Sequence, residues 1–171
     1  MLAQLQLERY RLDDLHVEFN QEWFEAGQPE ESLLWYDMDL DVQFYTKSDD
    51  ENIRLVQLSI ACKPQQEHAA ECRFDRIAVG LVGVFRVAEE TSEELRDVLL
   101  DLNSVSILHG IARGLIVSAT GSCAGGTFIL PAVNYQETLS QGALEEEQES
   151  EDSAAPEALP SGESENKTPV P

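Results

Sequence analysis

Apolar and polar residues alternate along several stretches of the first ninety residues, as in strands with one buried face. The clearest stretch runs from Tyr36 to Phe44, with apolar residues at the even positions and aspartates at 37, 39 and 41. An earlier strand is predicted over 14–19 and a third over 56–62. The polar cluster at 48–52 predicts the turn that joins the second strand to the third.

A fourth strand, from about 70 to 87, has a different pattern. Beyond Asp75 its residues are apolar at both odd and even positions, so both faces need cover. Helices can cover one face. A chain of this length has little left for the other, and the uncovered apolar face is a candidate for homo-oligomerisation.

Helical patterns follow the strands. Thr91 and Glu94 have the spacing of a capping box, which predicts a helix over 92–102. Apolar residues from Leu108 to Ala119 repeat at helical spacing and predict a second helix, which a glycine-rich loop at 120–127 ends. A short helix is expected within 128–139. The predicted fold class is α+β: a four-stranded antiparallel sheet with a crossover, followed by two or three helices.

The composition changes near Leu139. Residues 140–171 contain nine acidic residues, one basic residue and no aromatic residue. Such a segment cannot bury enough apolar surface to offset the entropy lost on ordering. We therefore expect one folded domain over 1–139 and a disordered acidic tail over 140–171.

The net charge of the chain favours some classes of binding partner and disfavours others. The 171 residues include 33 acidic and 11 basic side chains, for a net charge of −22. This charge repels phosphate backbones and argues against nucleic-acid binding, whereas basic or unfolded polypeptides fit it. The first ten residues show no apolar leader, and no apolar run is long enough to cross a membrane. We expect a cytoplasmic protein that does not insert into membranes.

No catalytic or metal-binding pattern stands out. The aspartates at 37, 39 and 41 resemble the start of a calcium loop, but Val42 occupies the position that requires glycine. The segment 121–127 lacks the lysine of a phosphate loop and follows a helix. Cys62, Cys72 and Cys123 form no Cys-x-x-Cys pair and are interpreted as small buried hydrophobic residues. We expect no enzymatic activity, no cofactor and no metal.

Aromatic residues are concentrated around the predicted connection between the first two strands. They are Phe19, Trp23, Phe24, Trp35 and Tyr36. These rings could be ordinary core that folds back over the sheet, or they could line an apolar groove with an acidic rim that binds extended polypeptide. The two interpretations are compatible.

The order of strands, helices and acidic tail resembles the SecB family of export chaperones, over about residues 9–139. Three segments carry the resemblance. Residues 14–18, Asp-Leu-His-Val-Glu, are similar to a motif in the family's first strand. Ile107, Leu108, Ala112 and Arg113 match the start of its long helix, and Leu130, Pro131, Val133, Asn134 and Tyr135 resemble a segment that follows it.

The resemblance implies an ATP-independent holdase that assembles as a homotetramer, a dimer of dimers. Such a chaperone binds unfolded or presecretory polypeptides in aromatic grooves and delivers them to the SecA motor. Docking of SecA would fall to Asp14 and Glu18. The sequence departs from the family at Arg73, where an acidic docking residue is expected, and at 109–111, where His-Gly-Ile replaces Phe-Pro-Tyr.

The functional hypothesis is therefore a SecB-like holdase whose aromatic groove holds non-native polypeptide for export through SecA. SecB-like chaperones also serve toxin–antitoxin systems, and this role needs no SecA site. A further alternative is an acidic protein–protein interaction module without an export role. Salt distinguishes this module from apolar client capture, since mainly electrostatic binding weakens with ionic strength.

Overall fold

The computed structural model describes residues 4–27, 31–47, 49–123 and 125–139. The chain divides into two units, Met1–Tyr135 and Gln136–Pro171. Residues 135–139 are helical, in agreement with the short helix expected there. The tail predicted over 140–171 lies outside the described residues. The remaining description concerns the first unit.

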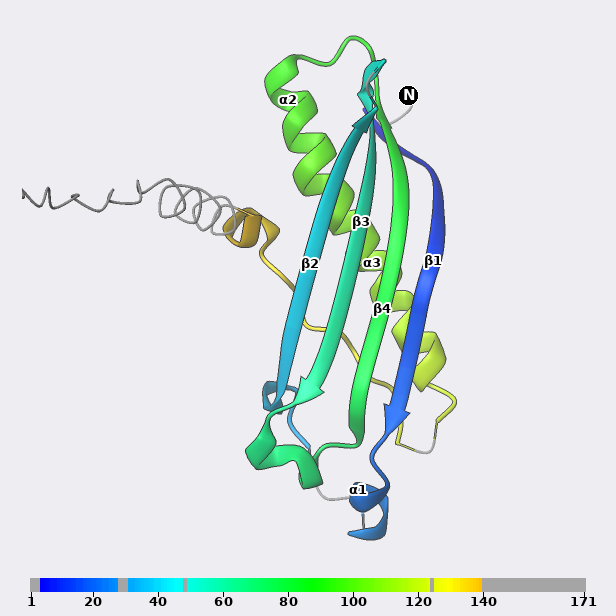
Figure 1. Ribbon diagram of the computed structural model, residues 1–171, viewed down its shortest axis with the longest axis vertical. Helices are drawn as coiled ribbons and strands as arrows, with labels where there is room; N and C mark the ends of the chain where they lie inside the picture. The colour runs from blue at the N-terminus through cyan, green and yellow to red at the C-terminus, as the bar shows by residue number, and fades with distance from the viewer. Residues whose placement is uncertain (1–3, 28–30, 48, 124, 140–171) are drawn as a thin grey trace, which may run out of the picture. The chain divides into compact units, whose positions relative to one another are not determined.

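Four antiparallel strands form one sheet in the order β1-β4-β3-β2 (Figure 1). They are β1 (Leu5–Phe19), β2 (Tyr36–Lys47), β3 (Asp50–Pro64) and β4 (Phe74–Val87). All four predicted strands are confirmed, and β1 begins well before the predicted start. Because β1 and β2 lie at opposite edges, the connection between them crosses the end of the sheet, as predicted.

Short helices build that end of the sheet. The crossover contains α1 (Gln21–Glu25) and the 3₁₀ helix η1 (Leu33–Trp35). A second 3₁₀ helix, η2 (Gln66–Glu71), connects β3 to β4. The prediction that β4 begins near residue 70 was therefore wrong, because η2 occupies that position and β4 begins at Phe74.

One long helix lies against one face of the sheet (Figure 1). It consists of α2 (Glu93–Val98), the π-helical turn η3 (Leu99–Asn103) and α3 (Ser104–Thr120). The two predicted helices are present as α2 and α3, and they follow one another without a break. No glycine or proline interrupts the helix before Gly110, and the π-helical turn continues the backbone into α3.

The capping-box prediction was also wrong. The N-cap of α2 is Ser92, and its side chain makes no capping hydrogen bond. The Thr91 amide donates to the carbonyl of Ala88 at 3.1 Å, so Thr91 belongs to the preceding turn. Its hydroxyl is buried without a hydrogen-bond partner among the described residues. The turn geometry therefore overrides the local sequence signal.

The core lies between β4 and α3. The buried side chains of β4 on the helix side are Ile77, Val79, Leu81, Phe85 and Val87. Across the interface, Leu108, Ala112 and Ile116 of α3 are fully buried. The alternate residues Gly80, Val82 and Val84 are only partly buried on the opposite, open face. β4 is therefore apolar on both faces, and the described residues leave its open face only partly covered.

The helix packs tightly against the sheet at Gly83. A Cβ atom at this position would lie 2.7 Å from Phe85 Cε2 and 2.9 Å from Leu108 Cδ2. Real Cβ atoms do not tolerate such distances, so glycine is needed for this packing.

Replacing Gly83 with alanine should therefore lower the free energy of unfolding by about 1–3 kcal/mol, the usual cost of overpacking a core. Urea unfolding of the purified variant measures this change. Gly80→Ala is the matched control, because the nearest atoms to its added Cβ would lie 3.6 Å away. Equal stability of the two variants would contradict the close packing at Gly83.

His109 connects α3 to the segment that follows it. Its Nε2 lies 3.0 Å from the carbonyl oxygen of Pro131, which can only accept, so Nε2 carries the hydrogen. Nδ1 then accepts from the Tyr135 hydroxyl at 2.7 Å. Burial lowers the pKa of His109 from its usual value of 6.5, although the hydrogen bond to Pro131 opposes this effect. The ring is held neutral.

This arrangement predicts a loss of stability in mild acid. Because the folded-state pKa of His109 lies below 6.5, the unfolded chain takes up the proton first as the pH falls. The free energy of unfolding should decrease below about pH 6.5, by up to ~1.4 kcal/mol per pH unit. Urea unfolding between about pH 7 and 5.5 measures the slope, and His109→Phe should flatten it. A slope unchanged in this variant would assign the effect to other groups.

Candidate functional site

The side chain of Asn20, at the start of the crossover, fixes the position of α1. As N-cap of α1, Asn20 accepts through Oδ1 from the amides of Glu22 at 2.9 Å and Trp23 at 3.3 Å. Its Nδ2 donates to the carbonyl oxygens of Ala69 at 2.7 Å and Cys72 at 2.8 Å. One buried amide therefore starts the helix and attaches it to the connection between β3 and β4.

A groove of about 450 Å³ lies between α1 and the loop that follows α3. It is lined by Phe19, Asn20, Gln21, Trp23, Phe24, Cys123 and Gly125. Phe24 is 54% exposed and Phe19 is 40% exposed, whereas Trp23 is buried. The two phenylalanines thus present apolar surface to solvent, and Trp23 supports them from the core.

The remaining two aromatic residues of the predicted groove lie elsewhere. Trp35 stacks on His68, with ring centroids 4.6 Å apart. Tyr36 is buried against Phe128, with centroids 5.1 Å apart. Neither residue lines the groove around Phe19 and Phe24. The structure therefore brings together three of the five aromatic residues singled out in the sequence.

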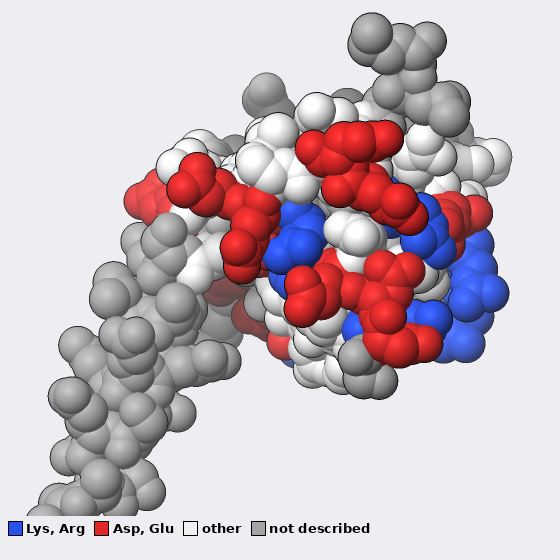
Figure 2. Space-filling model, turned by 90° about the horizontal axis from the view of Figure 1, so that it is seen from above, with Lys and Arg blue, Asp and Glu red and all other residues white. Residues whose placement is uncertain are grey.

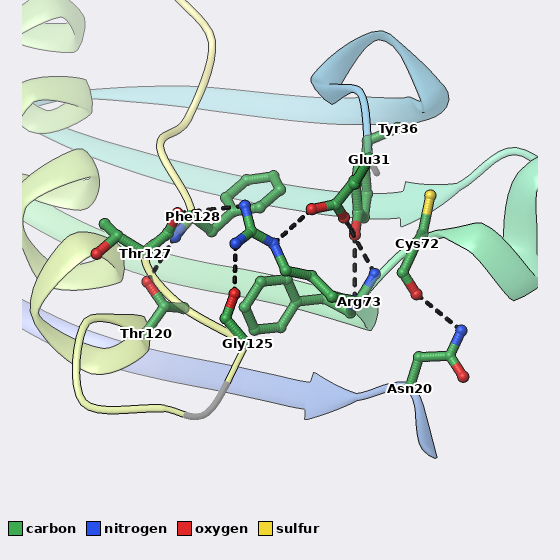
Figure 3. Close-up of polar contacts among 10 residues, drawn as sticks. Asn20, Glu31, Tyr36, Cys72, Arg73, Thr120, Gly125, Thr127 and Phe128 are labelled. Carbon is green, nitrogen blue, oxygen red and sulfur yellow. Dashed lines mark hydrogen bonds and ion pairs between the residues drawn. The ribbon is translucent and has the colours of Figure 1, made fainter. Parts of the chain in front are cut away.

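A polar network beside the groove fixes the loop that forms one of its walls (Figure 3). The Arg73 guanidinium forms an ion pair with Glu31 and donates to the carbonyl oxygens of Gly125 and Thr127. The Arg73 amide donates to Glu31 Oε1 at 3.0 Å. Arg73 thereby connects the crossover, the start of β4 and the loop after α3.

Tyr36 and Phe74 complete this network. The Tyr36 hydroxyl donates to Glu31 Oε1 at 2.5 Å and accepts from the Phe74 amide at 3.1 Å. Burial raises the pKa of Tyr36 strongly, so the hydroxyl remains a donor. Arg73, where an acidic residue was expected from the resemblance to SecB, therefore takes part in an internal network. The Glu31 side chain is only 8% exposed, and that of Arg73 is 21% exposed. No sequence pattern indicated the pairing, because 42 residues separate the partners.

Three carboxylates lie near one another at the end of the sheet that carries α1. Partial burial raises the pKa of Asp75, and the carboxylates of Glu18 and Glu22 raise it further. These three side chains come from β1, α1 and β4 and form a negative cluster at the end of the sheet where α1 lies. The opposite end of the sheet, viewed from above in Figure 2, also carries many acidic side chains, with basic ones between them.

Asp14 and Glu18, the predicted SecA-docking residues, are exposed on β1. Asp14 pairs with Gly80 of β4, and Glu18 pairs with Arg76. Asp14 lines a shallow depression on the open face together with Asp39 and Asp41 of the opposite edge strand. The two docking residues thus lie on the open side of the sheet, away from α3.

The described residues were searched for metal ligands and for reactive thiols. Among them, no group of three or more His, Cys, Asp or Glu side chains could hold a metal ion. Burial raises the pKa of Cys62 and of Cys72 to about 11, which keeps both thiols protonated. Cys123, expected to be buried, is partly exposed at the groove.

One helix has the length and composition of a membrane span. It covers Glu93–Thr120, and 33% of its most apolar window is buried inside the structure. Length and composition alone are weak evidence, because a helix that packs on a sheet meets the same criteria. α3 is such a helix.

Comparison with known proteins identifies solved structures with a similar fold. No protein-family model and no curated protein matches the chain. Among solved structures, the chain is similar to the Mycobacterium tuberculosis Rv1957 SecB-like chaperone in complex with a ChAD peptide from the Rv1956 HigA1 antitoxin. The TM-score is 0.50 at 13% identity, over 77% of this chain and 88% of that chain.

A protein of unknown function from Streptococcus agalactiae also matches, with a TM-score of 0.42 and 13% identity, over 77% of this chain and 100% of that chain. The similarity to Rv1957 supports the fold: this chain has the SecB-like arrangement of a four-stranded antiparallel sheet followed by helices.

Removing the charge of Glu31 tests the network. Glu31→Gln should lower the free energy of unfolding by about 1.5–3 kcal/mol, because it leaves the Arg73 guanidinium without its anionic partner. The loop at 121–127 should also become more sensitive to limited proteolysis, since Arg73 holds its carbonyl groups. Glu67→Gln is the control, as that side chain is 79% exposed. Similar effects of both variants would contradict the proposed role of the ion pair.

Proposed function

We propose that this protein is an ATP-independent chaperone that binds extended segments of non-native polypeptide in the groove around Phe19, Trp23 and Phe24. The observation that carries the proposal is an aromatic groove on a SecB-like fold, at the end of the sheet where Glu18, Glu22 and Asp75 lie near one another. Exposed rings offer apolar contacts of low sequence specificity, and the carboxylates favour basic flanking residues. Binding of this kind needs no cofactor and no catalytic residue.

Within this function, we propose cytoplasmic capture of presecretory polypeptides and their delivery to SecA, with Asp14 and Glu18 as docking residues. We also propose assembly as a homotetramer, a dimer of dimers. The exposed position of Asp14 and Glu18 on the open sheet face supports this docking role. A toxin–antitoxin role is the second candidate, and the antitoxin peptide in the similar Rv1957 structure favours it.

Aggregation of a chemically unfolded presecretory protein after dilution tests the holdase activity. Without nucleotide, the full chain at about one tetramer per client should suppress light scattering, and moderate salt should not abolish the suppression. Loss of suppression in salt would favour an acidic interaction module. No suppression at several-fold excess would contradict holdase activity.

Variants of exposed aromatic residues test the groove itself. Phe24→Ala should weaken binding of a fluorescent unfolded-client peptide by about tenfold, the effect of losing a contact worth more than ~1 kcal/mol. Tyr45→Ala is the matched control, because Tyr45 is 49% exposed on β2 away from the groove. Trp23 is unsuitable, since its burial makes unfolding the expected effect of truncation. Equal binding by both variants would exclude the groove.

A further inference from the structure

The open face of the sheet has a second hollow, on the half nearer the turn between β2 and β3. This depression of about 320 Å³ shares no lining residue with the aromatic groove. Its lining consists of Arg9, Tyr10, Arg11, Leu55, Val82 and Val84. The leucine and both valines are only partly buried, and the two arginines are exposed. We call these six residues the arginine patch.

The two halves of the open face differ in charge. Residues that pair across neighbouring strands lie side by side on one face, so the pairing divides that face into rows. Asp14 and Asp41 share one row on the half nearer the crossover. Arg11 and Arg9 begin the next two rows of the same face, and neither row contains a carboxylate on any of the four strands. The arginine patch is therefore a carboxylate-free area on an acidic chain.

The carboxylates next to the patch along β1 already have partners. The register of β1 against β4 shifts at Glu8 and at Asp13, on either side of the patch. Asp13 forms an ion pair with Arg11 at 2.5 Å, and Glu8 forms one with Arg86 at 2.5 Å. Among the described residues, Arg9 has no ion-pair partner. Its guanidinium therefore remains available to an acidic group of another molecule.

A guanidinium beside aliphatic side chains suits a polypeptide segment that has both carboxylates and apolar residues. Arginine binds a carboxylate through two parallel hydrogen bonds, and the partly buried leucine and valines of the patch add apolar contact. The net charge of −22 opposes such a segment at long range. At physiological ionic strength, charges separated by more than about 8 Å are largely screened, so the residues of the patch itself decide the contact.

The aromatic groove is poorly suited to an acidic segment. Glu18, Glu22 and Asp75 lie near one another at that end of the sheet, and their carboxylates repel acidic residues. A non-native polypeptide contains acidic stretches as well as basic ones. A chaperone that used the groove alone would leave the acidic stretches unbound.

We propose that the arginine patch binds acidic, apolar stretches of the same non-native polypeptides whose neutral or basic stretches bind in the groove. The inference rests on the proposed chaperone function. Arg9 in the patch and Phe19 in the groove both belong to β1. Their separation of about ten residues corresponds to roughly 33 Å along the strand, which an extended client spans with about ten residues of its own.

Fluorescence anisotropy with two short peptides tests the proposal. One peptide consists of glutamate, leucine and phenylalanine, and the other has lysine in place of glutamate. Both are titrated with the full chain at physiological ionic strength. Arg9→Glu should weaken binding of the acidic peptide by roughly tenfold, because a repulsion replaces an attraction, and should not weaken binding of the basic peptide. Phe24→Ala should show the opposite selectivity.

Arg76→Glu is the matched control for the change in net charge. Arg76 is exposed on the open face of β4 and lines the depression around Asp14, outside the arginine patch. This variant should bind the acidic peptide as tightly as wild type does. Equal weakening by Arg9→Glu and Arg76→Glu would assign the effect to the net charge and overturn the proposal.

Val84→Thr tests the apolar part of the patch. The substitution keeps a β-branched side chain, so the strand is retained, and it removes apolar surface. Binding of the acidic peptide should weaken by roughly twofold to fivefold. A wild-type chain that does not bind the acidic peptide, or unchanged binding in both Arg9→Glu and Val84→Thr, would overturn the proposal.

Two further measurements identify the occupant of the patch. Excess basic peptide should not displace the acidic peptide, whereas displacement would place both peptides in the groove and overturn the proposal. A peptide that joins the two stretches through about ten neutral residues should bind more tightly than either alone, and Arg9→Glu should remove this gain. A changed sedimentation mass of Arg9→Glu would assign the patch to a second copy of this chain and contradict client binding there. Binding of the acidic peptide without binding of the basic one would support the patch and contradict the groove, so the two failures are distinguishable.

Discussion

The contact of α3 with β4 at Gly83 determines which face of the sheet is buried. Side chains alternate along a strand, so this contact directs Ile77, Leu81 and Phe85 into the core and their neighbours outward. A register shift of one residue would exchange the two faces completely. The position of the acidic residues follows from the same constraint, because Asp14 and Asp39 occupy positions on the side opposite α3.

Long-range polar contacts build the groove at the end of this sheet. Asn20 fixes the start of α1, and Arg73 holds the loop after α3, so the two walls of the groove are positioned by different residues of neighbouring segments. Both residues act through backbone carbonyl groups of loops, which would otherwise lack partners near the core. The exposed rings of Phe19 and Phe24 can therefore remain in place without being buried themselves.

The sequence was informative where periodicity decides structure. Alternation predicted β2 from its first residue, Tyr36, because one face of that edge strand is exposed and polar. It did not predict the continuity of the long helix, since a π-helical turn at 99–103 has no sequence signature. Clustering of aromatic residues indicated the groove but not its membership: Trp35, the last residue of η1, stacks on His68, and Tyr36 enters the core. Which way a ring points depends on partners distant in sequence.

Negative charge near the groove affects which polypeptides can approach it. Phe19 and Phe24 expose apolar surface in the groove, and Glu18, Glu22 and Asp75 lie near one another at the same end of the sheet. These carboxylates repel a second copy of this acidic chain, whereas they do not repel a basic or neutral polypeptide. An apolar surface alone would not discriminate between the two.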